Sequence, residues 1–306
     1  MRWAILGGVA LIVVVALGLF GYRWYQANFV RPEKVVLHVG TTEVKLEYYA
    51  DRLYQFLVAN PSTSTSTGSQ ALLRELEAEE LNSQYAQAQG VDLSASAVTA
   101  FMAEEFGADL NSTGFESSYR AALRRTGWSD STYRREAAAR MANAELLELL
   151  EVEVGDTGEL LDFRAVVVAD EESAQDVFDR VEGGEDLGLI AQVESLDLTS
   201  RQNDGLIENQ TTETLQDELA LVLGDAAEGA LLGPVQAGNN WWVLRVEGRD
   251  PEGEYTDAQK AQIARARLAI ALEEFRATIL VRQDFTGSDY DWALQHTTVV
   301  DSPGVQ

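Results

Sequence analysis

The sequence contains no cysteine, which excludes disulfides, thiolate metal sites and thiol nucleophiles. It has only two histidines, His38 and His296, among 306 residues. One chain therefore cannot build a metal site from several histidines, and a histidine-based catalytic triad is disfavoured. The sequence also lacks a glycine-rich phosphate loop and a nucleophile-elbow serine. We expect no cofactor and no metal.

Basic residues are scarce as well. The chain has 23 Lys and Arg against 50 Asp and Glu, which gives a formal net charge of -27. Such a surface repels nucleic acid and anionic lipid headgroups, so we exclude nucleic acid as a partner and discount peripheral membrane binding. The charge keeps the protein soluble. The alternative is that it recruits basic segments or limits association with bound polypeptides.

One long apolar run lies near the N-terminus. Trp3 to Tyr22 (WAILGGVALIVVVALGLFGY) carries no charge and is flanked by Arg2 and Arg23. Twenty residues cross a hydrocarbon core of about 30 Å as a helix. The run exceeds the apolar core of a cleavable signal and lacks a good cleavage site, so an uncleaved anchor within residues 1–30 is favoured over a cleaved signal. Basic residues lie on both sides of the run, so the charge bias does not set the orientation of the anchor in the membrane.

The segment after the anchor predicts an α-helical domain over residues 31–155. Val35 to Val44 alternates around a Gly-Thr-Thr turn, which predicts a short hairpin. The polar stretch Asn60 to Ser69 predicts a loop. Helical spacing of apolar residues, with Ser94 and Ser129 as N-caps, predicts helices over residues 45–58, 70–89, 94–106, 114–126 and 129–150.

Composition changes near Gly155, and residues 156–250 predict a small α+β domain. The β-branched run Phe163 to Val168 predicts a buried strand. Gly233-Pro234 predicts a turn, and Trp241 to Val246 a closing strand. Between these strands the pattern predicts helices at residues 170–182 and 186–194, a loop at 195–210, and a third helix whose face is marked by Leu215, Leu219 and Leu223.

Residues 255–281 predict one long helix with an apolar stripe. The stripe consists of Ile263, Leu268, Leu272, Phe275 and Leu280. No further domain follows, so we expect residues 251–306, helix and tail, to pack on the helical domain. The predicted fold is α+β: a membrane-spanning helix, a helical domain completed by a C-terminal helix, and an inserted α+β domain.

Three runs in this order resemble the parvulin family of peptidyl-prolyl isomerases, in the SurA, PpiD and PrsA arrangement. VVLHVGTTEVKLEYYADRL is similar to the start of the SurA-type chaperone domain. FRAVVVADEESAQDVFDRVEGGEDLGLIAQVESLD is similar to the opening half of a parvulin domain, and LQDELALVLGDAAEGALLGPVQAGNNWWVLRVEGRD to its closing half. With the anchor and the C-terminal helix, the resemblance covers nearly the whole chain.

The resemblance implies an isomerase site in which several family residues are replaced. The family's first histidine follows the arginine of the first strand, where Arg164 is here followed by Ala165. Trp242 stands in place of the second histidine. The acidic or thiol position of the following loop is kept as Asp197. Asp197 is the catalytic candidate, although an aspartate there also suits a turn or helix cap.

The substrate-binding candidates are apolar. Leu215, Leu219 and Leu223 replace the family's methionine and phenylalanine pocket, or are simply core residues. Trp241 and Trp242 alternate faces of a strand, so we expect one in the core and the other exposed for contact with a bound polypeptide. Ala165 completes the set. Leu232 replaces a serine or threonine, and Asn203-Asp204-Gly205-Leu206 a longer glycine motif.

These observations predict a membrane-anchored, extracytoplasmic folding factor of the peptidyl-prolyl isomerase type. It would bind unfolded or proline-containing exported polypeptides, with the protein-export machinery as a further candidate partner. We expect the chain in the cell membrane as a single-pass protein with its bulk outside the cytoplasm. Loss of both family histidines keeps two alternatives open: a catalytically inactive holdase chaperone, and a structural subunit of a membrane assembly.

Overall fold

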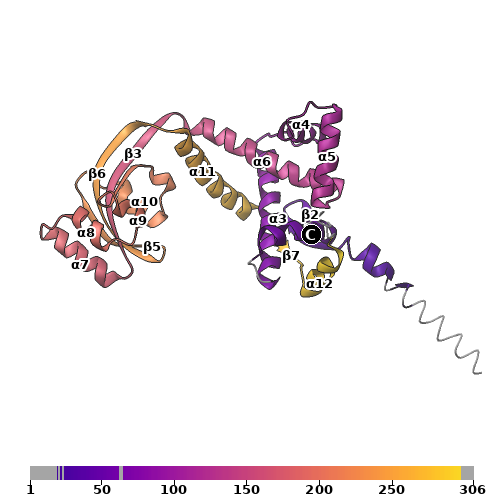
Figure 1. The fold of residues 1–306 in the computed structure, drawn as a ribbon, viewed down its shortest axis with the longest axis horizontal. Coiled ribbons are helices and arrows are strands. Elements are labelled where there is room, and N and C mark those ends of the chain that lie inside the picture. The colour runs from indigo at the N-terminus through magenta and orange to yellow at the C-terminus, as the bar shows by residue number, and fades with distance from the viewer. Residues whose placement is uncertain (1–18, 20, 23, 62–64, 298–306) are drawn as a thin grey trace, which may run out of the picture. The chain divides into compact units, whose positions relative to one another are not determined.

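The computed structural model describes residues 19, 21–22, 24–61 and 65–297. The chain forms two compact units (Figure 1). Unit 1 combines the residues up to Leu146 with those from Leu272 onward, and unit 2 is the continuous stretch Leu147–Ala271. The chain passes from unit 1 to unit 2 within α6 (Asp130–Val154) and returns within α11 (Asp257–Thr278).

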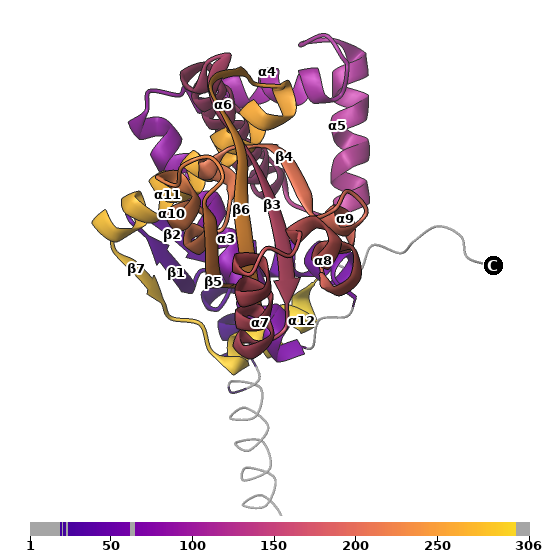
Figure 2. The same ribbon diagram turned by 90° about the vertical axis from the view of Figure 1, so that its left-hand side faces the viewer.

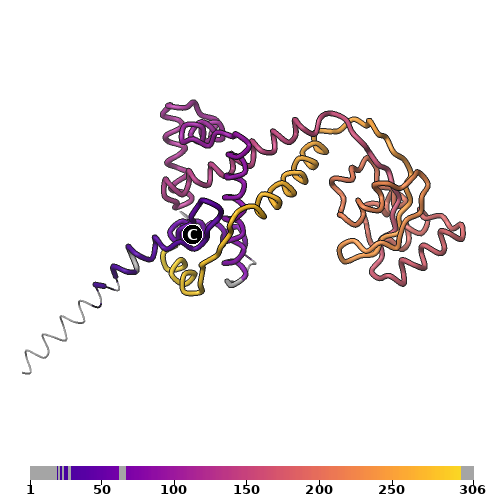
Figure 3. The backbone as a smooth tube through the Cα atoms, turned by 180° about the vertical axis from the view of Figure 1, so that it is seen from behind, coloured from indigo at the N-terminus to yellow at the C-terminus, as the bar shows by residue number. Residues whose placement is uncertain are grey.

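The first half of unit 1 is built around a three-stranded antiparallel sheet, in the order β2-β1-β7. Its strands are β1 (Val35–Val39), β2 (Thr42–Lys45) and β7 (Val281–Gln283). Figure 3 shows the yellow C-terminal segment beside the indigo N-terminal one in this sheet. The helices that bury apolar side chains against it are α2 (Leu46–Ala59), α3 (Thr65–Ala88) and α12 (Gly287–His296).

The second half of unit 1 is a helical layer of α4 (Ala95–Glu105), α5 (Thr113–Thr126) and the first part of α6. Its core contains the stacked rings of Phe115 and Tyr119. The predicted serine caps are confirmed, because Ser94 Oγ accepts a hydrogen bond from Ala97 N at 3.3 Å and Ser129 Oγ from Thr132 N.

Unit 2 contains a four-stranded antiparallel sheet in the order β4-β3-β6-β5. The strands are β3 (Thr157–Val168), β4 (Leu206–Gln210), β5 (Leu231–Ala237) and β6 (Asn240–Glu254). The two long central strands, β3 and β6, lie side by side (Figure 2). The shorter elements are α7 (Glu171–Glu182), α8 (Leu187–Glu194), α9 (Leu198–Arg201), the 3-10 turn η2 (Thr212–Thr214) and α10 (Asp217–Gly224).

Each face of this sheet has its own apolar core. On one face, Val166 and Val243 are packed with residues of α7 and α8. On the other face, Phe163 and Leu244 are packed with Leu219 and other residues of α10. Side chains alternate across a strand, so consecutive residues of β3 and β6 contribute to different cores. The predicted strands at 163–168 and 241–246 are confirmed, although both extend further along the chain.

Three predicted elements were wrong. The polar stretch 60–69 is not a loop throughout, because α3 begins at Thr65. Helix propensity is a weak guide once tertiary packing supplies partners. The loop predicted at 195–210 contains α9 and the edge strand β4. The Gly233-Pro234 turn instead lies within β5, where the pairing register shifts between Leu232 and Val235.

The long C-terminal helix is shorter than predicted. α11 ends at Thr278, and Val281 begins β7, which pairs with β1. Leu280 is exposed and is not part of the buried stripe. Leu272 and Phe275 pack against the core of unit 1, as expected for the end of this helix. The pairing partner of β7 lies about 240 residues earlier, so no local pattern revealed this strand.

The predicted membrane anchor falls mostly outside the described part of the chain. Of Trp3 to Tyr22, the structure describes Leu19, Gly21 and Tyr22 alone. Within the described residues, no helix combines the length and apolar character needed to cross a bilayer.

Candidate functional site

Five of the six substrate-binding candidates lie on one face of the unit 2 sheet. Ala165 of β3 is fully buried there, next to Leu244 of β6 in the sheet pairing. From α10, Leu219 and Leu223 are four residues apart and lie on the side of the helix that covers this face. Leu215 precedes the helix and is half-buried in the same cluster. These side chains pack against one another, and we refer to this packed cluster, with Trp242, as the apolar hollow.

Trp241 and Trp242 lie on opposite faces of the sheet. Trp242 belongs to the apolar hollow and pairs with Val235 of β5. Trp241 belongs to the core beneath α7 and α8. The predicted alternation is confirmed, but the expectation that one of the two is exposed was wrong. Both rings are half-buried, because helices cover both faces of the sheet.

The indole of Trp242 carries an unpaired donor. Its Nε1 is buried and has no hydrogen-bond partner. It is the one such side-chain atom among the residues of unit 2, all of which the structure describes. A buried donor without an acceptor costs about 1–3 kcal/mol. The indole nitrogen is donor only, so an acceptor that reaches the hollow would remove this cost.

Asp197 is the N-cap of α9. Its carboxylate accepts hydrogen bonds from Thr199 N at 3.1 Å and Ser200 Oγ at 2.6 Å. The loop that carries it lies beside β3, where Leu196 N donates to Val167 O at 2.7 Å. Val167 is in turn paired with Trp242. Asp197 therefore comes directly after Leu196, which is hydrogen-bonded to the β3 residue that pairs with Trp242. The Asp197 carboxylate is already hydrogen-bonded within the helix cap.

The turn before β4 is fitted against Ala165. Gly205 has φ +76°, and a Cβ there would lie 2.5 Å from Ala165 O and 2.7 Å from Ala191 Cβ. Gly205 O accepts a hydrogen bond from Ala165 N at 2.9 Å. A side chain at 205 would be both strained and displaced. The glycine kept from the shortened motif thus fixes the backbone next to the site.

Sequence reasoning missed lining residues on both edge strands. Ile207 of β4 and Val235 of β5 pack in the apolar hollow, as does Leu232. The only signal in the sequence for these lining residues was the resemblance at Leu232, because the segments of β4 and β5 carry the polar and Gly-Pro residues typical of loops.

Arg164, which precedes Ala165, forms an ion pair with Glu247 at 3.1 Å.

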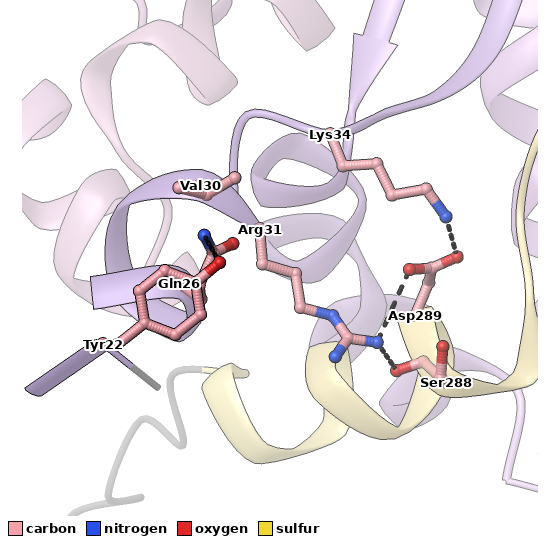
Figure 4. A pocket seen from close by; sticks show the side chains of 7 residues that line it. All are labelled: Tyr22, Gln26, Val30, Arg31, Lys34, Ser288 and Asp289. Atoms are coloured by element: carbon pink, nitrogen blue, oxygen red, sulfur yellow. Dashed lines mark hydrogen bonds and ion pairs between the residues drawn. The ribbon is translucent and has the colours of Figure 1, made fainter. Parts of the chain in front are cut away.

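No three His, Cys, Asp or Glu side chains of the described residues group closely enough to hold a metal ion. A separate cavity of about 600 Å³ lies in unit 1, between the segment from Tyr22 to Lys34 and α12 (Figure 4). In it, Asp289 accepts from Lys34 and is 3.6 Å from Arg31 Nη2. Tyr22 and Val30 supply apolar surface. None of the predicted site residues lines this cavity.

Unit 2 is thus an antiparallel sheet with helices on both faces and a packed apolar cluster beneath α10. Residues 167–248 match the family model described as the PPIC-type PPIase domain, or rotamase. Residues 167–248 thus form a parvulin-type domain, and the predicted resemblance to the SurA/PrsA-type parvulin proteins is confirmed over this part of the chain.

Two curated relatives show the extent of the likeness. Chaperone SurA of Pseudomonas aeruginosa is 31% identical over 100 residues, which is 32% of this chain and 24% of the relative. Chaperone SurA of Pseudomonas syringae pv. tomato is 32% identical over 97 residues, 31% of this chain and 23% of the relative. This chain thus spans about a quarter of the length of the curated relatives it matches.

Among solved structures, the peptidylprolyl isomerase PrsA from Bacillus anthracis is similar with a TM-score of 0.45 and 16% identity. The match covers 74% of this chain and 95% of that one. The parvulin domain of PpiD from E. coli is similar with a TM-score of 0.27 and 22% identity, over 32% of this chain and 93% of that domain.

Proposed function

We propose that this chain is a membrane-anchored, extracytoplasmic folding factor whose parvulin unit binds proline-containing segments of unfolded exported polypeptides in the apolar hollow. The observation that carries the proposal is the buried, unpaired Nε1 of Trp242 among apolar side chains. A proline ring suits the apolar lining, and the carbonyl oxygen of the adjoining peptide supplies the acceptor that the indole lacks.

The chemistry that such a site can perform is limited to the twist of one peptide bond. The barrier of about 18–20 kcal/mol arises from lost amide resonance. Apolar surroundings favour the twisted, less delocalised amide. A donor to the carbonyl oxygen of the twisting bond itself would stabilise the planar form. The Trp242 N–H is therefore proposed to hold the bound segment through a neighbouring peptide carbonyl and not to lower the barrier. No covalent bond forms or breaks. The catalytic role of Asp197 remains a proposal beside its role as a helix cap.

Two observations favour binding over fast catalysis. Ala165 offers no polar group at the position of the family's first histidine, and the Asp197 carboxylate is already bonded to Thr199 and Ser200. Lost supporting groups at a preorganised site cost on the order of 2–4 kcal/mol in barrier. The second candidate function is therefore a holdase chaperone without isomerase activity. A structural subunit of a membrane assembly would instead show no affinity for unfolded chains.

The membrane location is part of the same proposal. It is supported by the uncharged run Trp3 to Tyr22 and by exposed aromatic residues that follow it. Trp24, Tyr25 and Phe29 are exposed, and the Phe29 ring lies 5.5 Å from that of Trp24. Aromatic rings of this kind gather at the membrane–water interface. The export machinery is a candidate neighbour at that surface.

The test is peptide-detected exchange NMR on the full chain in detergent micelles, with a panel of short Xaa-Pro peptides. We expect weak acceleration of cis–trans exchange and measurable binding. Trp242→Phe keeps an aromatic ring and removes the N–H, so it should weaken peptide binding about fivefold to tenfold, as expected for one hydrogen bond. Trp241→Phe is the matched control on the opposite face and should leave binding unchanged.

The outcomes separate the candidates. Binding with no acceleration supports the holdase. Acceleration that is lost in Asp197→Ala assigns that carboxylate to catalysis, whereas full retention leaves it as a cap. Equal affinities of the wild type and Trp242→Phe, with equal urea midpoints, would remove the indole from the site. No binding of any Xaa-Pro peptide would refute the proposal.

A further inference from the structure

Unit 2 exposes an apolar strip outside both of its cores. The strip consists of Leu189 and Val193 of α8, Leu196 of the following loop, and Leu198 at the start of α9, each 53% to 70% exposed. α9 is tied to α8, because Arg201 Nε donates to Gln192 O at 2.7 Å. α8 and α9 are neighbours beside β3 (Figure 2). Leu189 and Val193 are one helical turn apart on the exposed side of α8, and Leu196 and Leu198 follow closely in the chain.

The pattern of α8 points to a partner. Its inner side, with Leu187, Ile190 and Ala191, is buried in the core beneath it. Its outer side carries Leu189 and Val193, so the helix is apolar on both sides. Helices of this kind are ordinarily covered on both sides. Grouped exposed apolar residues with a polar rim mark interaction surfaces.

The rim of the strip is negative. Two cations lie next to the strip. Arg201 donates to the backbone carbonyl of Gln192, and Arg180 is held by three carboxylates, those of Asp176, Glu185 and Glu194. This cluster alone keeps a net negative charge. The same bias holds for the whole unit, because residues 147–271 contain 28 acidic and 8 basic residues. A partner that is apolar and basic is therefore complementary, and an acidic partner is repelled.

We propose that the apolar strip binds extended, unfolded polypeptide segments in which apolar side chains are interspersed with Lys or Arg, independently of proline. The inference rests on the proposed function, since the strip would supply a second contact for the same class of ligand, unfolded polypeptides. The strip differs from the apolar hollow, because α8 covers one face of the sheet and α10 the other. Mutations can therefore separate the two.

The experiment measures binding of fluorescent, proline-free 12-residue peptides to the full chain in micelles by anisotropy. One peptide alternates Leu and Lys, and the other alternates Leu and Glu. We expect the Leu/Lys peptide to bind at least tenfold more tightly, with an affinity that falls as salt is raised. Leu189→Gln/Val193→Gln should weaken it about tenfold. Leu221→Gln is the matched control, since Leu221 is an 80% exposed leucine of α10.

Isomerisation and binding of a short Xaa-Pro peptide are measured on the same variants. Retained Xaa-Pro binding in Leu189→Gln/Val193→Gln, with lost Leu/Lys binding, supports a separate strip. Failure of the Xaa-Pro assay alone would affect the proposed function and not this surface. The strip proposal is overturned if Leu221→Gln weakens binding equally, or if both peptides bind equally. It is also overturned if the strip instead mediates a dimer that the double substitution dissolves in sedimentation.

Discussion

At the scale of single residues, Arg52 of α2 is a buried arginine with several carboxylate partners. Its side chain is 6% exposed and forms two hydrogen bonds with Glu79, at 2.6 and 2.7 Å, and one with Glu75 at 2.8 Å. The guanidinium also lies 5.0 Å from the ring centroid of Trp128. Burial raises the pKa of Glu75 above its ordinary value despite this partner. The arginine thus connects α2 to α3 and to the start of α6.

Arg52→Met should lower the free energy of unfolding of unit 1 by about 3–5 kcal/mol, because it leaves two partly buried carboxylates without their cation. The measurement is urea unfolding followed by circular dichroism. Arg120→Met is the control, since Arg120 pairs with Glu116 on an exposed helix face, and it should cost less than about 0.5 kcal/mol. Equal midpoints for the two variants would show that the buried pairing does not stabilise the unit.

At the scale of elements, α12 is fixed by one aspartate. Asp289 accepts from Thr286 N at 2.8 Å and Thr286 Oγ at 2.6 Å, which completes a capping box. It also accepts from Lys34 Nζ (Figure 4). Burial of the Asp289 carboxyl raises its pKa, but the hydrogen bonds from Lys34 and Thr286 outweigh burial and hold the pKa below its ordinary 3.8.

Asp289→Asn should destabilise unit 1 by about 2 kcal/mol at pH 7, from a weakened cap and a lost ion pair. The folded pKa is depressed, so the carboxylate's stabilisation is present above pH 3.8 and is lost as pH falls through the folded pKa. The difference in the free energy of unfolding between wild type and Asp289→Asn should therefore be constant from pH 7 to about 5 and become smaller at lower pH. Urea midpoints across this range provide the check.

Asp291→Asn is the control for this series, because Asp291 lies on the same helix and is exposed. It should change stability by less than about 0.5 kcal/mol. A gap between wild type and Asp289→Asn that stays constant down to pH 2 would mean that the carboxylate charge is not what stabilises α12.

At the scale of the whole molecule, the negative charge is unevenly divided. Unit 2 has 28 acidic and 8 basic residues, whereas the rest of the chain has 22 and 15. The parvulin unit therefore supplies most of the net charge of -27. An acidic unit attracts basic polypeptides from a distance and repels anionic membrane surfaces. This division agrees with the proposal that unit 2 contacts basic unfolded segments.

The absence of cysteine makes the proposed location directly testable. Ala227→Cys places a single thiol in an exposed loop of unit 2. We expect a membrane-impermeant maleimide to label this variant in intact cells, because the body should lie outside the cytoplasm. Labelling that occurs only after lysis would show that unit 2 lies inside the cell, opposite to the proposed orientation. Recovery of the intact chain, with residues 1–30 still present, in the soluble fraction after lysis would contradict the predicted membrane anchor.

Local patterns predicted most helices of this chain, since amphipathic spacing and serine caps are recorded in consecutive residues. They predicted the central strands β3 and β6 from the run of valines in β3 and the Trp and Val residues of β6. They failed at β4 and β5, whose residues look like loop or turn residues, and at β7, whose first residue was assigned to the preceding helix. These segments become strands only by pairing with distant segments. The resemblance identified the family and pointed to Ala165, Asp197 and Trp242.

The sequence by itself determined the resemblance to parvulin domains, the apolar character of the candidate site and the excess of negative charge, because these depend on which residues are present and in what order. Only the tertiary structure decided that Trp242 has an unpaired donor and that Asp197 caps α9. It alone showed that Leu189 and Val193 are left outside the core. Burial and hydrogen-bond partners depend on which distant segments meet, and the spacing of residues along a chain does not record that.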